Sequence, residues 1–138
     1  MRSFKWNAGH AVYLPEIDAE HRAIFQAAEA LQHAVQGSAT SEQVLEVLRG
    51  LMGQVEDHFT HEERLMAVAR YRSADWHKQQ HDAVRKRAKH TVGRVQKGDV
   101  ESAIDFVEFL SGWLRDHMAV ADRMMGAFLR NYQRANAA

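Results

Sequence analysis

The chain has 138 residues, enough for one domain with a hydrophobic core, and its 18 basic and 18 acidic residues give a formal net charge of zero. That balance gives no electrostatic reason to expect nucleic acid or an anionic membrane as a partner. The lack of cysteine excludes disulfides, thiolate metal sites and cysteine nucleophiles.

The amino-terminal residues have no apolar run behind their charges, and no stretch approaches the length of a membrane span. We therefore expect a cytoplasmic protein with no membrane partner. Nine histidines and a single proline stand out in the composition. Many histidines favour metal or proton chemistry, and few prolines favour long helices.

Hydrophobic periodicity predicts an amino-terminal arm, residues 1–16, followed by four amphipathic helices. The helices cover about residues 18–36, 41–69, 74–97 and 100–132, and Thr40 with Gln43 is placed for a capping box before the second. Short connections favour antiparallel neighbours. The expected fold is all-α, an up-down-up-down antiparallel four-helix bundle in one domain, residues 1–138.

Each predicted helix carries ionisable residues on or beside its apolar stripe. His58 and Glu62 are four residues apart, as are His77 and His81, and this spacing stacks side chains on one helix face. A carboxylate on an apolar face is costly unless a partner such as a metal ion offsets its burial. The antiparallel order brings one candidate set of metal ligands to the same end of the bundle: His21, His58, Glu62, His77, His81, His117 and Asp122.

Asp122 follows His117 by five residues, a rise of only ~7.5 Å along an α-helix, so we expect its carboxylate to reach back toward the same point. Seven protein ligands are too many for one ion and suit two. In two ideal octahedra, five histidines, two bridging carboxylates and one bridging oxygen leave a single position open. The histidines then divide three and two. Imidazole with carboxylate suits iron, whereas zinc normally takes four ligands.

The pattern resembles the ligand signature of the hemerythrins, and the resemblance covers nearly the whole chain. Flanking residues match bacterial members as well: Trp6, Ile17-Asp18 before His21, Phe59 after His58, Glu63, Leu65-Met66, and Trp113-Leu114 before His117. The family binds dioxygen reversibly at the iron that has two histidines. The resemblance implies one iron on His77, His81 and His117, a second on His21 and His58, and bridges from Glu62, Asp122 and an oxo or hydroxo group.

Several positions depart from the usual bacterial pattern without being ligand positions. Tyr13 stands where a glycine is common, Glu29 where asparagine is frequent, Met118 where isoleucine is usual, and Met125 where a tyrosine often follows the aspartate. We expect six residues to line the oxygen pocket over the open position: Ile24, Phe25, Phe59, Trp113, Leu114 and Met118. Oxygen affinity and oxidation rate depend on this lining.

Other interpretations of these motifs are weaker. His61-Glu62 begins like a zinc-protease motif, but Leu65 occupies the second histidine position. Two Glu-x-x-His motifs are not found, which disfavours the ferritin-like class. The remaining histidines are expected on the surface without convergent partners: His10, His33, His61 and His90.

Three function classes follow. The first is a non-haem diiron protein that binds dioxygen for storage, delivery or scavenging, and is not an enzyme. The second is an enzyme that uses the same site to reduce peroxide or nitric oxide, or to oxidise iron. The third is an oxygen or redox sensor with an unidentified protein partner. The apolar pocket lining offers no obvious proton donor for O–O cleavage, so it favours reversible binding.

Overall fold

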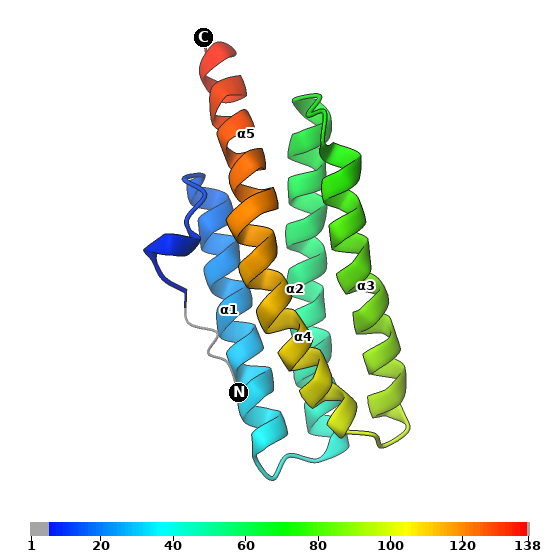
Figure 1. Cartoon of the computed structure of the whole chain (residues 1–138). Helices are drawn as coiled ribbons and strands as arrows, with labels where there is room; N and C mark the ends of the chain where they lie inside the picture. The colour runs from blue at the N-terminus through cyan, green and yellow to red at the C-terminus, as the bar shows by residue number, and fades with distance from the viewer. Residues whose placement is uncertain (1–5, 138) are drawn as a thin grey trace.

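The computed structural model describes residues 6–137, so residues 1–5 of the predicted arm lie outside the described part. Helices α1 (Pro15–Gln36), α2 (Ser41–Val68), α3 (Ala74–Gln96) and α4 (Glu101–His117) alternate in direction along the bundle (Figure 1). A π-helical turn, η2 (Met118–Asp122), joins α4 to α5 (Arg123–Ala135). The predicted all-α, up-down-up-down four-helix bundle is confirmed.

Local chemistry explains the helix boundaries. Thr40 and Gln43 exchange two hydrogen bonds, 2.9 and 3.1 Å long, in the predicted capping box at the start of α2. Gly98, whose φ is +92°, ends α3 in a left-handed conformation that glycine adopts without strain. The first helix begins three residues earlier than predicted, at Pro15 instead of Asp18, because proline suits the first helical position, where no amide hydrogen is needed.

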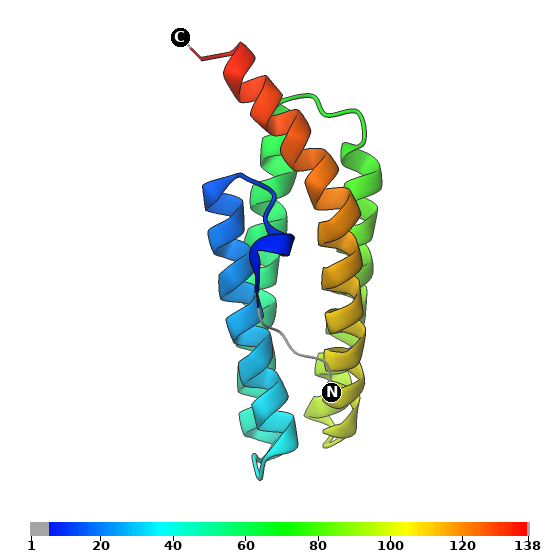
Figure 2. The same ribbon diagram turned by 60° about the vertical axis from the view of Figure 1, so that its left-hand side comes forward.

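The arm crosses from α1 toward α5 along one side of the bundle (Figure 2). It contains a short 3-10 turn, η1 (Ala8–His10). Arg123 donates to the Gly9 carbonyl and Arg130 to the Val12 carbonyl, which ties the arm to α5. Tyr13 has a φ of +62°, so a tyrosine occupies a backbone conformation that favours glycine. A glycine would adopt this backbone conformation without strain.

The buried apolar residues form two clusters, separated along the bundle by a polar layer. The larger cluster runs from Ile24 and Phe59 toward the α1–α2 and α3–α4 connections, and the smaller includes Ile17, Met66 and Met125 near the other end. On each helix the predicted ligands lie at the boundary between the two clusters, with His58 and His117 directly before Phe59 and Met118 of the larger cluster. Each is at most 4% exposed, so this layer is sealed between two hydrophobic cores.

Candidate metal centre

Five histidines and two carboxylates converge in the polar layer, as the sequence predicts. α1 supplies His21, α2 supplies His58 and Glu62, and α3 supplies His77 and His81. His117 is the last residue of α4, and Asp122 is the last residue of η2. The possible ligand atoms form two overlapping sets, and within each set all atoms lie within 4.8 Å of one another. One set is Glu62, His77, His81, His117 and Asp122, and the other is His21, His58 and Glu62.

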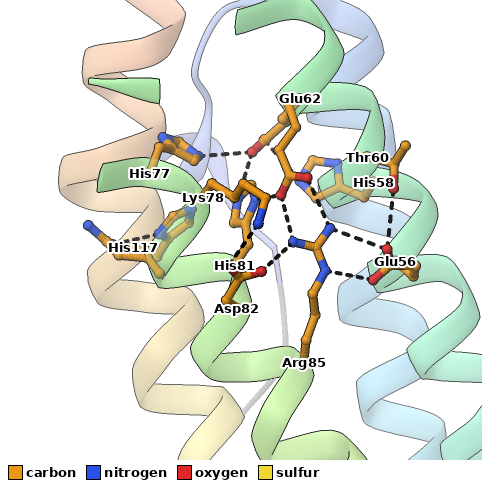
Figure 3. Close-up of polar contacts among 12 residues, drawn as sticks. Glu56, His58, Thr60, Glu62, His77, Lys78, His81, Asp82, Arg85 and His117 are labelled. Atoms are coloured by element: carbon orange, nitrogen blue, oxygen red, sulfur yellow. Dashed lines mark hydrogen bonds and ion pairs between the residues drawn. The ribbon is translucent and has the colours of Figure 1, made fainter. Parts of the chain in front are cut away.

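The two carboxylates face both histidine sets at once. Glu62 Oε1 lies 3.1 Å from Nε2 of both His77 and His81 (Figure 3). Its Oε2 lies 3.0 Å from His58 Nε2 and 3.6 Å from His21 Nε2. Each oxygen therefore faces a different set. This is the arrangement that a carboxylate takes when it bridges two cations.

Asp122 repeats the pattern from the opposite side of the layer. Its Oδ1 lies 3.1 Å from His77 Nε2 and 3.0 Å from His117 Nε2, and its Oδ2 lies 3.3 Å from His21 Nε2. Adjacent ligand atoms of an octahedral ion with bonds of ~2.1 Å are separated by about 3.0 Å, compared with about 3.4 Å around a tetrahedral ion. Most of these separations match the octahedral value.

The π turn explains how Asp122 reaches this layer. In a regular α-helix, a residue five positions after His117 would be rotated about 140° away from it. The π-helical i→i+5 pattern of η2 inserts one extra residue and returns Asp122 to the face of His117. Asp122 therefore lies where it was expected. A local change in helix type places it there, and its side chain does not reach back along a regular α-helix.

Partners outside the ligand layer fix the tautomers of three histidines. His58 Nδ1 donates to Glu20 Oε1 at 2.6 Å, and His81 Nδ1 donates to Glu63 Oε2 at 2.8 Å. Because these carboxylate oxygens only accept, each Nδ1 carries the hydrogen and Nε2 of the neutral ring presents its lone pair to the layer.

His117 Nδ1 lies 2.8 Å from the amide oxygen of Gln80, which gives the same tautomer. The sequence did not predict the role of Glu20, Glu63 or Gln80 as histidine partners, although Glu63 belongs to the matched motif. The first and third directly precede a ligand, Glu20 before His21 and Gln80 before His81, yet each serves a histidine of another helix. Their roles are therefore visible only once the helices are packed.

In the neutral tautomer, histidine lone pairs would face carboxylate lone pairs at about 3 Å with nothing between them. Among the described residues, Nε2 of His21, His81 and His117 is buried without a hydrogen-bond partner. Such a layer is repulsive unless cations lie between the atoms. Either protons or metal ions can supply that charge, and the donor set therefore fits a metal centre.

The pKa values describe the layer when protons supply the charge. Burial disfavours the charged imidazole, but the carboxylates of Asp122 and Glu62 outweigh it and raise the pKa of His21 and His77 to about 9. Burial is likewise outweighed at His58, where Glu62 and Glu20 raise the pKa to about 10. Burial raises the pKa of the two layer carboxylates, but the facing histidines hold it well below its usual range.

An ion network flanks the three-histidine set on its outer side. Arg85 donates to Glu63 at 2.7 Å while also pairing with Glu56 and Asp82 (Figure 3). Its guanidinium lies over the Phe59 ring. Burial opposes ionisation of Glu63, but Arg85 and His81 lower its pKa. Glu63 is therefore a neutralised carboxylate that holds the His81 ring.

The six predicted pocket residues all belong to the larger apolar cluster or pack against it: Ile24, Phe25, Phe59, Trp113, Leu114 and Met118. The ring of Phe59 stacks on His81 at 3.9 Å, and that of Trp113 stacks on His117 at 4.3 Å. These two rings cover the three-histidine set. Their part in a pocket over His21 and His58 stays a prediction.

Two of the four histidines expected on the surface without partners, His61 and His10, are partly buried and have partners. His61 Nδ1 lies 2.6 Å from Glu20 Oε2, on the same carboxylate that binds His58. His10 is half-buried and its ring packs edge-on against Phe25 at 5.0 Å. His33 and His90 are exposed as expected.

The fold and this layer define a helical-bundle protein with a histidine- and carboxylate-rich centre suited to cations. The chain matches the family model of the hemerythrin HHE cation binding domain over residues 13–129. It therefore belongs to the hemerythrin family, which confirms the resemblance seen in the sequence.

Curated relatives agree with this assignment. The chain is 25% identical over 119 residues to a myohemerythrin of Theromyzon tessulatum, covering 86% of this chain and 88% of the relative. It is 22% identical over 124 residues to a bacteriohemerythrin of Clostridium acetobutylicum, covering 87% and 96% of the two chains. A bacteriohemerythrin of Aquifex aeolicus is 38% identical over 72 residues, half of this chain and 54% of the relative. Within the described residues, no helix is long and apolar enough to cross a membrane.

Proposed function

We propose that this chain is a non-haem diiron protein that binds dioxygen reversibly. The observation that carries the proposal is the orientation of Glu62 and Asp122, because each aims one oxygen at the three-histidine set and the other at a histidine of the two-histidine set. His77, His81 and His117 would hold one iron and His21 and His58 the other. The seven residues then act as one centre.

Iron fits this donor set better than zinc does. The layer offers only imidazole nitrogens and carboxylate oxygens, and most of their separations suit octahedral coordination. The unequal division of histidines leaves the ion on His21 and His58 with one protein ligand fewer. A reduced diiron pair supplies electrons and an open coordination position to dioxygen, and the protein's part is to keep that position accessible and dry.

The chain's own residues favour binding over turnover. Ile24, Leu114 and Met118 are at most 5% exposed and place hydrocarbon beside the ligand layer. Such a lining excludes bulk water and supplies no general acid, whereas breaking an O–O bond normally requires protons. The enzyme alternative, which requires O–O cleavage, therefore predicts a different result when the reduced protein meets oxygen.

The test starts from protein loaded with iron and reduced under anaerobic conditions. On exposure to air, we expect a visible charge-transfer band that disappears when oxygen is removed and returns through repeated cycles. Oxidation in a single step that only a reductant reverses would overturn reversible binding and favour the enzyme. A chain that takes up only one zinc ion and no iron would overturn the diiron proposal.

Pocket variants sharpen this test. Leu114→Ala should keep its iron but lose the oxygenated form faster, because opening the lining admits water and protons. Leu110→Ala is the matched control, since it removes the same atoms one turn further from His117. Met118→Ile should slow the loss or change it little. An unchanged decay in Leu114→Ala would remove Leu114 from the pocket.

A further inference from the structure

The carboxylate of Glu20 joins two histidines of α2. Its Oε1 accepts from His58 at 2.6 Å and its Oε2 accepts from His61 at 2.6 Å. Both contacts are charge-assisted and short. His58 and His61 lie three residues apart, so α2 presents both rings to α1 on neighbouring positions. One carboxylate is thereby fixed at both of its oxygens.

The surroundings of His58 make such fixing necessary. A cavity of about 210 Å³ lies beside it, lined by Glu20, Ala23, Ile24, Gln54, Asp57 and His58. The Glu20 side chain is 33% exposed, so without a second partner it is free to turn toward solvent. An ordered glutamate loses side-chain rotamer entropy, which a single hydrogen bond offsets only in part.

The other layer histidines with outer partners are held differently. Glu63, which binds His81, is fixed by Arg85 from α3. Gln80, which binds His117, lies on α3 one residue before His81. The described contacts of Glu20 are to His58 and His61. His61 therefore holds Glu20 as Arg85 holds Glu63.

We propose that His61 is a positioning residue, which fixes Glu20 and through it orients His58 toward the metal position that His58 shares with His21. The inference rests on the proposed diiron function. His61 touches none of the layer atoms in the described contacts, and its own ring is 23% exposed, with Nε2 3.8 Å from Glu16. It acts on the centre only through Glu20.

Metal titration of the full chain tests the proposal without any oxygen chemistry. Cobalt(II) is the probe, since its visible absorption reports each bound ion and it is stable in air. The parent should bind two ions. His61→Ala should weaken one of the two by about 10- to 100-fold, the usual effect of losing an outer partner of a metal ligand, and leave the other unchanged.

Two further variants separate positioning from a general loss of structure. His61→Asn should recover most of the lost affinity, because the asparagine amide nitrogen occupies the same place along the side chain as His61 Nδ1 and donates similarly. His90→Ala, at an exposed histidine of α3, should bind both ions like the parent. Far-UV circular dichroism of each variant checks that the bundle is folded.

Each outcome bears on a different claim. Two ions bound by His61→Ala as tightly as by the parent would overturn the positioning role alone. Equal weakening of both ions, or no recovery in His61→Asn, would overturn it in favour of a merely structural contact. A parent chain that binds a single ion would overturn the proposed function and the positioning role with it.

Discussion

Metal loading of this centre should release protons, and its affinity should rise steeply with pH. In the metal-free layer, the pKa values of His21 and His77 are raised to about 9 and that of His58 to about 10. At pH 7 these three rings are therefore protonated. An imidazole must be neutral to bind a metal ion, so loading both positions displaces a proton from each of the three.

The number of displaced protons sets how steeply the free energy of metal loading depends on pH. Three protons change the free energy of loading by about 4 kcal/mol per pH unit, since one proton corresponds to ~1.36 kcal/mol per unit. Between pH 6 and pH 8 the apparent constant for loading both ions should therefore rise by about six orders of magnitude. Water that ionises as it bridges the ions would add to this slope.

Isothermal titration calorimetry with cobalt(II) measures the released protons directly when it is repeated at pH 7 in buffers of different ionisation enthalpy. We expect a release of about three protons per chain from the ligand histidines, in addition to any from bound water. Fewer than two protons, with an affinity that is flat between pH 6 and pH 8, would refute the charged state of the layer.

Stability of the metal-free protein should follow the opposite trend. The raised pKa values of His21, His58 and His77 contribute stability that is complete below about pH 6.5 and is lost as the pH rises through 9 to 10. The lowered pKa values of Glu62 and Asp122 contribute stability that is present above about pH 4.5 and lost in acid. The gain in Tm on metal loading should therefore grow from pH 6 to pH 9.

The remaining predictions concern the stability of the scaffold. A Cβ at Gly126 would lie 2.8 Å from the Val12 carbonyl oxygen, so Gly126→Ala should lower the free energy of unfolding by about 1–3 kcal/mol in urea titrations. A Cβ at Gly93 would meet open space, so Gly93→Ala should raise the free energy of unfolding by ~0.5–1 kcal/mol. Phe106→Ala, at a fully buried ring, should cost ~3–5 kcal/mol by the same measurement. Thr40→Ala should cost ~1 kcal/mol through loss of the α2 cap, and an unchanged urea midpoint would contradict the capping role.

The fold and the convergence of the seven candidate ligands were predictable because their signals are periodic. The pairs His58 with Glu62 and His77 with His81 repeat at the α-helical interval, and the antiparallel order fixes their depth in the bundle. The contribution of Asp122 was predicted for an incomplete reason, because a π turn has no clear signature in the local sequence. Only the unusual five-residue spacing from His117 pointed to it.

Partners of the ligands could not be predicted from one sequence. Glu20 and His61 are 41 residues apart, and whether they meet depends on the rotation of α1 against α2, which hydrophobic periodicity leaves uncertain by tens of degrees. A polar residue at the edge of an apolar stripe looks like a solvated one. The conformation of Tyr13 was equally hidden, since a tyrosine gives no sign of a positive φ.

In the proposed centre, two irons share this layer unequally, with three histidines on one and two on the other. A crystal structure of the iron-loaded protein with azide, recorded at the iron absorption edge, tests it most directly. We predict two anomalous peaks bridged by Glu62 and Asp122, with azide on the iron held by His21 and His58. A single peak, or azide on the iron of His77, His81 and His117, would contradict the account.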